Sequence, residues 1–282
     1  MSRAALWATG PREPEQLRLP FEARGLSEVT ISSGLLKLTP DYDVLAWLCE
    51  RWAQQPTSSG VMRPTLYELG SDLYAAAPSG KDYQTLREAL SRLAWVKVQI
   101  FGIDAITGEV GDIETRGSLL SLAQTRTLTD GKDRISVVLD YWLRRSISEG
   151  APVRVPWRTL RLFGRNHQLA KRLWIYLAAE RWKPFGDGTQ EGCWIRYGDR
   201  LEAALAMNYE RRRAARDALK QACLTIRRTD ARYAAGHLEL VKVGRAWHIQ
   251  AERPTWTEWQ ELRPKHEAAR AAITAALKQA SV

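Results

Sequence analysis

Residues 208–224 read NYERRRAARDALKQACL, and residues 237–249 read HLELVKVGRAWHI. The first stretch carries a stripe of small or apolar side chains from Ala215 to Ala222, at the spacing of one helix face. In the second stretch apolar and polar residues alternate on both sides of Gly244, which is the pattern of a β-hairpin. The sequence therefore predicts a helix that begins at Asn208, as its N-cap, and a hairpin after it.

The elements before this helix complete a common layout. Apolar periodicity predicts a long helix from about His167 to Trp182 and a short strand over Cys193–Tyr197. Gly198 and Asp199 begin a further short helix. Three helices followed by a strand pair form a winged helix.

The first half of the chain repeats this order. Helices are expected from Asp41, after Pro64, and from Asp82 as an N-cap, and the β-rich run Val96–Phe101 follows the third helix. The third helices also share a short match, since residues 87–90 read REAL and residues 216–219 read RDAL. In the first of them, Arg87 and Arg92 are expected to point outward, with Glu88 between them.

We therefore expect an α+β fold with two tandem winged-helix domains, a flexible N-terminal arm and a C-terminal helical tail. In the tail, a short helix is expected near residues 255–262, and a second from Pro264 to about Ala280. The expected boundaries are 1–38 for the arm, 39–149 for the first domain, 150–253 for the second, basic domain and 254–282 for the tail.

The positive charge is concentrated in one of these segments. The whole chain has a formal net charge of +10, whereas residues 150–253 alone carry +11 and residues 39–149 carry −3. A basic module beside a slightly acidic one indicates a polyanionic partner, and nucleic acid is favoured over an anionic membrane surface because no basic amphipathic helix has a broad aromatic and aliphatic face.

The helix after Asn208 is the expected DNA reader. Its cationic side chains cluster on an arc beside the apolar stripe, where arginine can bind guanine bidentately and lysine can contact phosphate. A solvated charged face is the alternative interpretation of such a run. The hairpin adds Lys242 and Arg245 beside its turn, and further arginines, among them Arg232, lie on the approach to it. The predicted DNA-binding residues are Tyr209, Arg212, Arg213, Arg216, Lys220, Arg227, Arg228, Lys242 and Arg245.

Near the start of the chain, residues 16–21 read QLRLPF. In an extended stretch alternate side chains project the same way, so Leu17, Leu19 and Phe21 could enter one pocket, while Pro20 limits the entropy lost on ordering and Gln16 could hydrogen-bond at the rim. The same alternation also suits an edge strand of the protein's own sheet, and the sequence leaves both interpretations open.

No catalytic or metal site is expected. The chain lacks a glycine-rich phosphate loop, its four histidines are scattered, and its three cysteines match no ligand spacing. Sparse cysteines and the lack of a long apolar run favour a cytoplasmic protein that uses no cofactor and no membrane.

The stretch Gln16–Phe21 resembles the peptide by which bacterial replication proteins dock onto the sliding clamp. Together with two winged-helix modules and a basic third helix, it makes the chain similar to plasmid replication initiators of the TrfA type. The resemblance implies a non-enzymatic protein that binds double-stranded origin repeats (iterons), promotes local melting and recruits the sliding clamp, the replicative helicase and the initiator machinery of the host. It also implies a homodimer through the first winged helix. Fewer residues precede the first module here than in some such proteins. A transcriptional repressor with tandem winged helices is the alternative, and a polynucleotide-processing enzyme is a third hypothesis.

Overall fold

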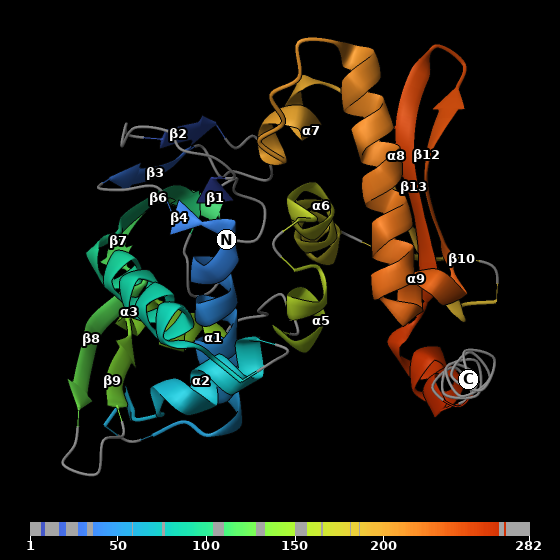
Figure 1. Cartoon of the computed structure of the whole chain (residues 1–282). Coiled ribbons are helices and arrows are strands. Elements are labelled where there is room, and N and C mark those ends of the chain that lie inside the picture. Colours follow the sequence, from blue (N-terminus) through green and yellow to red (C-terminus); the bar gives the residue numbers. More distant parts are fainter. Residues whose placement is uncertain are drawn as a thin grey trace. The chain divides into compact units, whose positions relative to one another are not determined.

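The computed structural model describes residues 7–8, 17–20, 28–32, 36–57, 59–74, 77–103, 110–127, 133–149, 157–164, 166–180, 182–185, 187–264 and 268. The chain divides into two compact units, Met1–Gln168 and Leu169–Val282. Each unit combines helices with β-sheet (Figure 1), which confirms the mixed α+β class.

The first unit contains a three-helix arrangement with a small sheet. The helices α1, α2 and α3 precede a three-stranded antiparallel sheet of order β5-β9-β8. In chain order these elements are α1 (Asp43–Gln54), β5 (Val61–Met62), α2 (Leu66–Leu73), α3 (Gly80–Trp95), β8 (Leu120–Thr127) and β9 (Asp133–Leu139).

Two capping boxes set where α2 and α3 begin. The Thr65 hydroxyl accepts from the backbone N–H of Glu68, whose carboxylate accepts from the N–H of Thr65. Ser79 and Asp82 make the same reciprocal pair at the start of α3. Asp82 is thus the third residue of the helix and not the N-cap, because the Ser79 hydroxyl accepts from the backbone N–H of Asp82 itself.

A buried ion pair joins the start of the first unit to α3. The Asp41 carboxylate is fully buried and lies in the turn η1 (Leu38–Tyr42), just before α1. It accepts from Arg92 Nε at 2.9 Å and Nη2 at 2.8 Å, and from the backbone N–H of Lys37 at 2.9 Å. Arg92 therefore points inward, against expectation, because a buried carboxylate needs a cationic partner. Its neighbour Arg87 forms an ion pair with Asp133.

The first unit also has a second, larger sheet. Its strand order is β2-β3-β6-β7 and all pairs are antiparallel. The strands are β2 (Leu17–Pro20), β3 (Glu28–Ser32), β6 (Lys97–Ile103) and β7 (Val110–Ser118), and β1 (Trp7–Ala8) pairs separately with β4 (Leu36–Lys37). The described part of the predicted flexible arm is thus hydrogen-bonded into a sheet. This corrects the expectation of a flexible arm for residues 17–20 and 28–32, since β3 satisfies its backbone groups against both β2 and β6.

Two short helices follow, α4 (Tyr141–Glu149) and α5 (Trp157–Leu162). Both pack on α1, and α5 also contacts α2. Trp157 and Leu160 are buried, so α5 belongs to the first unit although the sequence placed it after the boundary at 149/150. The other predicted domain limits stay predictions.

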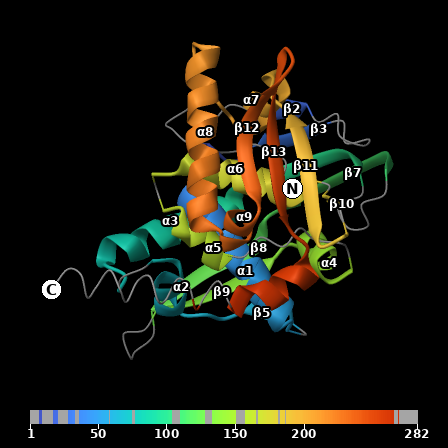
Figure 2. The ribbon, with the colours of Figure 1, turned by 90° about the vertical axis from the view of Figure 1, so that its right-hand side faces the viewer.

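The second unit carries a four-stranded antiparallel sheet of order β10-β11-β13-β12, whose strands lie side by side in Figure 2. The helix α8 packs along β12, with Leu219, Ala222 and Ile226 buried. In chain order the elements are α6 (Gln168–Ala179), β10 (Lys183–Phe185), β11 (Gln190–Arg196), α7 (Asp199–Ala204), α8 (Arg212–Thr229), α9 (Ala231–Ala235), β12 (His237–Val243) and β13 (Ala246–Pro254).

The two units share one order of elements. In the first unit α1, β5, α2, α3, β8 and β9 follow one another, and in the second α6, β11, α7, α8, β12 and β13 do so. The strand orders β5-β9-β8 and β11-β13-β12 also match, because the last strand lies in the middle of each sheet. Burial agrees with the short sequence match: aligning REAL with RDAL superposes three buried pairs, which are Leu86 with Ala215, Leu90 with Leu219 and Leu93 with Ala222. The repeat therefore extends from sequence to topology.

Beyond β13, residues 256–264 are helical and Trp259 is buried. This agrees with the first predicted tail helix. The second tail helix lies outside the described residues apart from the start at Pro264 and residue 268.

Candidate nucleic-acid interface

The basic helix α8 buries one face and exposes the rest. Ala215, Leu219, Ala222, Cys223 and Ile226 are buried, whereas Ala218, expected in the same stripe, is only half-buried. The apolar stripe thus continues about one turn beyond the predicted one and seats the helix on the sheet.

The helix begins three residues later than the sequence suggested. Arg211 is the N-cap, with an extended backbone, and its side chain makes no capping hydrogen bond. Asn208 and Tyr209 lie in the connection that precedes it, because α7 ends in a turn at Ala206 (φ 44°) and the chain needs residues 207–211 to reverse direction. Tyr209 is 44% exposed in that connection.

A buried arginine holds this connection. Arg172 in α6 donates from Nη1 to the carbonyl oxygens of Leu205 at 2.7 Å and Ala206 at 3.2 Å. Burial lowers the pKa of Arg172 to about 10, so the guanidinium remains charged at neutral pH. These two carbonyls follow the last turn of α7, where a cation compensates acceptors that the helix leaves free.

Two predicted contact residues near the start of α8 make only solvent-exposed ion pairs. Arg212 Nη2 lies 3.2 Å from Asp199 Oδ1, with side chains 74% and 85% exposed. Arg213 Nε lies 3.9 Å from Asp217 Oδ2, with side chains 89% and 61% exposed. Exposed pairs of this kind contribute about 0–1 kcal/mol, so both guanidinium groups can exchange these partners for phosphate or base edges.

The next two cations, Arg216 and Lys220, share an aromatic partner. Arg216 Cζ lies 5.4 Å and Lys220 Nζ 5.3 Å from the ring centroid of Trp247 in β13. Both are cation–π distances. Trp247 is not among the predicted DNA-binding residues. Its position in the strand after the turn, opposite Lys242, is the feature of the sequence that could have indicated it.

The hairpin turn continues the basic surface. Gly244 has φ 59° in the tight turn between β12 and β13, and Lys242 and Arg245 are exposed on either side of it. Lys242 pairs directly with Trp247 in the antiparallel register. Directly paired residues project to the same face of a sheet, so Lys242 lies on the face that also carries Trp247.

The structure separates the remaining predicted cations from this group. Arg227 and Arg228 lie in the last turn of α8, two turns beyond Lys220 and about 10 Å further along the axis at a rise of 1.5 Å per residue, at the end opposite Arg212. The predicted cations thus divide into a group on the first part of α8 and the hairpin turn, and a pair at the C-terminal end of α8. The cluster, called the α8–wing surface below, comprises Arg212, Arg213, Arg216, Lys220, Lys242 and Arg245.

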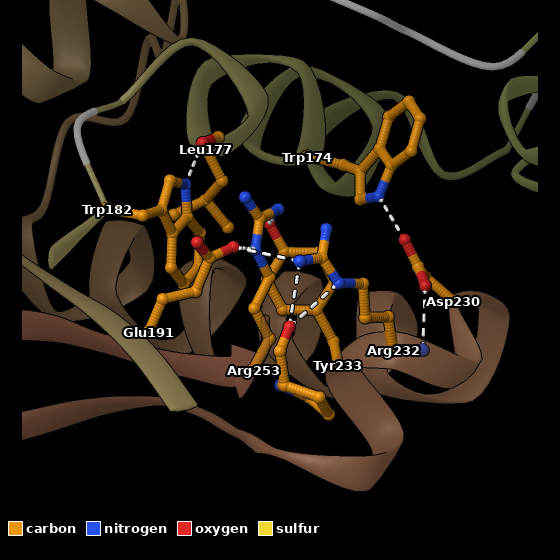
Figure 3. Close-up of polar contacts among 9 residues, drawn as sticks. Trp174, Leu177, Trp182, Glu191, Asp230, Arg232, Tyr233 and Arg253 are labelled. Carbon is orange, nitrogen blue, oxygen red and sulfur yellow. Dashed lines mark hydrogen bonds and ion pairs between the residues drawn. The ribbon is translucent and has the colours of Figure 1, made fainter. Parts of the chain in front are cut away.

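Arg232, expected on the approach to the hairpin, is committed to an internal network (Figure 3). Arg232 Nη2 and Arg253 Nε donate to Glu191 Oε1 at 2.9 and 2.7 Å, and Arg232 also donates twice to the carbonyl oxygen of Pro254. All three charged side chains are less than 20% exposed. Burial, and next to it the charge of Arg253, lowers the pKa of Arg232.

The same network ties the base of the sheet to the helices around it. Arg253 Cζ lies 3.7 Å from the ring centroid of Trp182, whose Nε1 donates to the carbonyl oxygen of Leu177 in α6. Trp174 Nε1 donates to Asp230, the N-cap of α9 (Figure 3). These contacts fix α6, α9, β11 and β13 and leave the α8–wing surface outside the network.

The third helix of the first unit presents a different surface. Both of its central arginines are held by carboxylates, Arg87 by Asp133 and Arg92 by Asp41. In the alignment of REAL with RDAL, Arg87 corresponds to Arg216, which faces the ring of Trp247, and Arg92 corresponds to the uncharged Gln221. The first unit therefore offers a weaker basic surface on this helix, as the sequence indicated.

The structure describes four of the six residues of the predicted docking peptide, Leu17–Pro20. Leu17, Leu19 and Pro20 lie in β2, where Leu17 pairs with Ile31 and Leu19 with Val29, while Gln16 and Phe21 lie outside the described residues. β2 is an edge strand of its sheet, which is the arrangement that the sequence left open as the alternative to a docking peptide.

The described residues offer no metal-binding group: nowhere in them do three or more His, Cys, Asp or Glu side chains approach closely enough to hold an ion. Burial raises the pKa of each of the thiols of Cys49, Cys193 and Cys223 to about 12. They are therefore protonated at neutral pH and lack the thiolate character of a nucleophile. A search of the same residues for membrane-crossing helices found none of sufficient length and apolarity.

Comparison with known proteins gives a likeness in fold. No protein-family model matches the chain, and no curated protein sequence matches it. The crystal structure of selenomethionine derivatives of domains 2 and 3 of RctB is similar over 86% of this chain and 92% of that chain, with 16% sequence identity and a TM-score of 0.51. A second crystal structure of RctB domains 2 and 3 has the same coverage, 15% identity and a TM-score of 0.46. The chain is therefore similar in fold to domains 2 and 3 of RctB.

Proposed function

We propose that this protein is a replication initiator that binds double-stranded DNA through two winged helices, the second of which makes the main contacts. The repeated topology of the two units supports the winged-helix assignment, because each has three helices and a sheet in the order that this fold requires. The observation that carries the proposal is the α8–wing surface, in which six cations from one helix and one hairpin turn are exposed or half-buried.

The geometry suits a duplex. A helix seated in a major groove presents its outer side chains to base edges, and a hairpin turn beside it reaches the adjacent backbone. Arg212 and Arg213 are exposed at the start of α8, the end that recognition helices commonly insert. Lys242 and Arg245 are placed to bind phosphate.

The initiator role draws on two further observations. RctB, whose domains 2 and 3 share this fold, is a replication initiator. The stretch Gln16–Phe21 resembles a sliding-clamp peptide, and a protein without catalytic chemistry of its own needs to recruit polymerase machinery. Origin repeats, a plasmid origin of replication, the host helicase and a homodimer through the first winged helix are parts of the same proposal, as is activity without any enzymatic step.

Electrophoretic and fluorescence binding assays test DNA recognition. A pool of 30-base-pair duplexes of random sequence is selected with the intact protein, and the selected duplex is compared with the unselected pool. We expect selection of repeated elements and a steep fall of affinity with salt, because several phosphates are neutralised. A protein that enriches no sequence and binds duplex DNA without salt dependence would contradict the proposal.

Clamp docking has its own test. The double substitution Leu19→Ala with Phe21→Ala should abolish retention on an immobilised bacterial sliding clamp. Val29→Ala with Ile31→Ala is the matched control, because it weakens the partner strand β3 and leaves the peptide intact. Clamp binding that is equal in the parent and in the Leu19/Phe21 variant, or lacking in the parent, excludes docking.

The pairing of β2 into a sheet favours one second candidate, a tandem winged-helix transcriptional repressor in which Leu17–Pro20 is only an edge strand. A repressor binds its operator as the initiator binds its origin, but it supports no replication. A plasmid that carries the selected DNA and this gene, with no other origin, separates the two: maintenance supports the initiator, and loss together with repression of an adjacent promoter supports the repressor.

A further inference from the structure

Trp247 contacts two cations of the α8–wing surface, and it is not among the residues that the sequence predicted to bind DNA. Trp247 lies in β13, close to the tip of the β12–β13 hairpin, and its ring faces two cations of α8. Its backbone is fixed from both sides: the carbonyl oxygen accepts from the N–H of Tyr197 at 2.8 Å, and the residue pairs with Lys242 in the ladder. The backbone that carries the ring is therefore held in place before any ligand arrives.

Two cations one helical turn apart are placed over this single ring. Arg216 and Lys220 stand at i and i+4 of α8, the spacing at which side chains lie one above the other on a helix face. Arg216 Cζ and Lys220 Nζ are 5.4 and 5.3 Å from the ring centroid. Neither Arg216 nor Lys220 has an ion pair in the described part of the chain. The aromatic face is thus the contact that orders both of them.

We infer that Trp247 is a positioning residue for DNA recognition, which holds the Arg216 and Lys220 side chains in the orientation in which they contact the duplex. Long cationic side chains lose rotamer entropy on binding, and a contact that orders them beforehand reduces that loss. A guanidinium or ammonium over a ring keeps its N–H groups on the outer side available as donors. The inference rests on the proposed DNA binding by α8 and adds the reason why these two cations are ready for it.

The structure supplies a matched control. Trp194 in β11 is 55% exposed and pairs in register with Gln250 of β13. Because Gln250 and Trp247 are three residues apart in β13, Trp194 and Trp247 lie on opposite faces of the sheet. The aromatic contact of Trp194 is with His248, at 6.0 Å between ring centroids, and its ring has no cation–π contact among the described residues. Trp194→Leu therefore removes an aromatic ring from the same sheet without touching Arg216 or Lys220.

The first measurement concerns the free protein. A proton above the face of an aromatic ring is shifted upfield by the ring current. In protein labelled with ¹³C-lysine, the ε-methylene signal of Lys220, assigned by its loss in Lys220→Ala, should lie upfield of the other lysines. It should return to the common position in Trp247→Leu and stay upfield in Trp247→Phe and Trp194→Leu. A Lys220 signal at the common position in the parent protein overturns the inference.

The second measurement concerns the bound state, with the selected 30-base-pair duplex and an unselected duplex as probes. Trp247→Leu should weaken binding of the selected duplex about tenfold, because the Arg216 and Lys220 side chains would then lose their rotamer entropy on binding. Trp247→Phe should recover most of the loss, because a smaller ring still attracts cations, and Trp194→Leu should bind as the parent does. Because charge is unchanged, the slope of affinity against salt should stay that of the parent.

A double-mutant cycle distinguishes positioning from a general effect on the fold. In the background Arg216→Ala with Lys220→Ala, replacing Trp247 by Leu should have no further effect on affinity. A loss of the same size in that background means that Trp247 acts through another route, and the inference is wrong. If instead Arg216→Ala with Lys220→Ala leaves affinity at the parent value, the proposed role of α8 in DNA binding fails, and the inference built on it fails too.

Discussion

Arg172 donates a hydrogen bond of 2.7 Å from Nη1 to the carbonyl oxygen of Leu205, and this contact connects α6 to the turn that leads into the basic helix. The adjacent carbonyl of Ala206 lies 3.2 Å from the same nitrogen. Ala206 has a left-handed backbone (φ 44°), which a residue with a Cβ adopts only when the surroundings hold it. A buried cation from α6 therefore holds the turn that leads from α7 toward α8, together with the backbone hydrogen bonds of the turn itself.

Replacing this cation should affect both stability and recognition. Arg172→Met keeps most of the apolar stem but leaves two carbonyls without their charged donor, so the free energy of unfolding should fall by about 1.5–3 kcal/mol. Binding of the selected duplex should weaken at temperatures where the variant is still folded, because the start of α8 loses its anchor. Urea unfolding and binding at 10 °C measure the two effects. Arg200→Met, which changes an exposed arginine of α7, serves as the control and should leave both unchanged; an equal loss in the two variants would contradict the anchoring role.

The ion pair between Arg92 and Asp41 should be expensive to break. Asp41 is fully buried, so Arg92→Met leaves a carboxylate without its cation, at a cost of about 3–5 kcal/mol in unfolding free energy. Arg87→Met in the same helix removes an ion pair whose arginine is 44% exposed and should cost about 0–1 kcal/mol. Urea titration of both variants measures the difference, and similar losses would show that burial does not set the cost.

Glu191 should be important for stability because it accepts hydrogen bonds from two arginines, Arg232 and Arg253. Glu191→Gln keeps the shape of the side chain but leaves Arg232 and Arg253, both less than 20% exposed, without a counter-charge. We expect a loss of about 3–5 kcal/mol in unfolding free energy. Because this network lies outside the α8–wing surface, the affinity of the variant for the selected duplex should stay near that of the parent at temperatures where the variant is folded. A variant as stable as the parent would mean that the two arginines find other partners.

The thiols predict a dependence of stability on pH. Burial raises the pKa of Cys49, Cys193 and Cys223 to about 12, above the value of about 8.5 for a thiol in an unfolded chain. The unfolded state alone loses these protons between about pH 8.5 and 12, so stability due to the thiols is complete below that window and is lost as the pH rises through it. Unfolding free energies at pH 7.5 and 10, compared between the parent and Cys49→Ala with Cys193→Ala and Cys223→Ala, measure this part. An equal fall in both proteins would contradict it.

Local patterns in the sequence predicted much of the second unit. The apolar stripe of α8, the turn at Gly244 and the short helix after Gly198 are each encoded within a few residues, and all three occur where expected within about three positions. The signals are local because helix periodicity, a glycine with positive φ and a helix start depend on neighbouring side chains.

The features that the sequence did not predict share a physical cause, since each depends on contacts between residues that are distant in the sequence. Asp41 was assigned to a helix start, but it is buried against Arg92, 51 positions away. The arm was expected to be flexible, whereas β2 pairs with β3 and β3 with β6 across the first unit. The contact of Trp247 with Arg216 and Lys220 could not be predicted, because it joins a strand to a helix that lies earlier in the sequence. Among the cations predicted to contact DNA, the sequence could not separate Arg227 and Arg228 from the rest, since this requires the length of the helix and the place of the hairpin.

The most direct measurement of the central claim compares Arg213→Ala and Arg216→Ala with Arg228→Ala, all three in the same helix. In binding to the selected duplex, the first two should each cost about 1–3 kcal/mol and relax the sequence preference. Arg228→Ala, at the far end of α8, should change affinity by less than about 0.5 kcal/mol, within the range of an exposed charge. Three variants with the affinity, salt dependence and sequence preference of the parent would contradict the account, because the α8–wing surface would then have no part in DNA recognition.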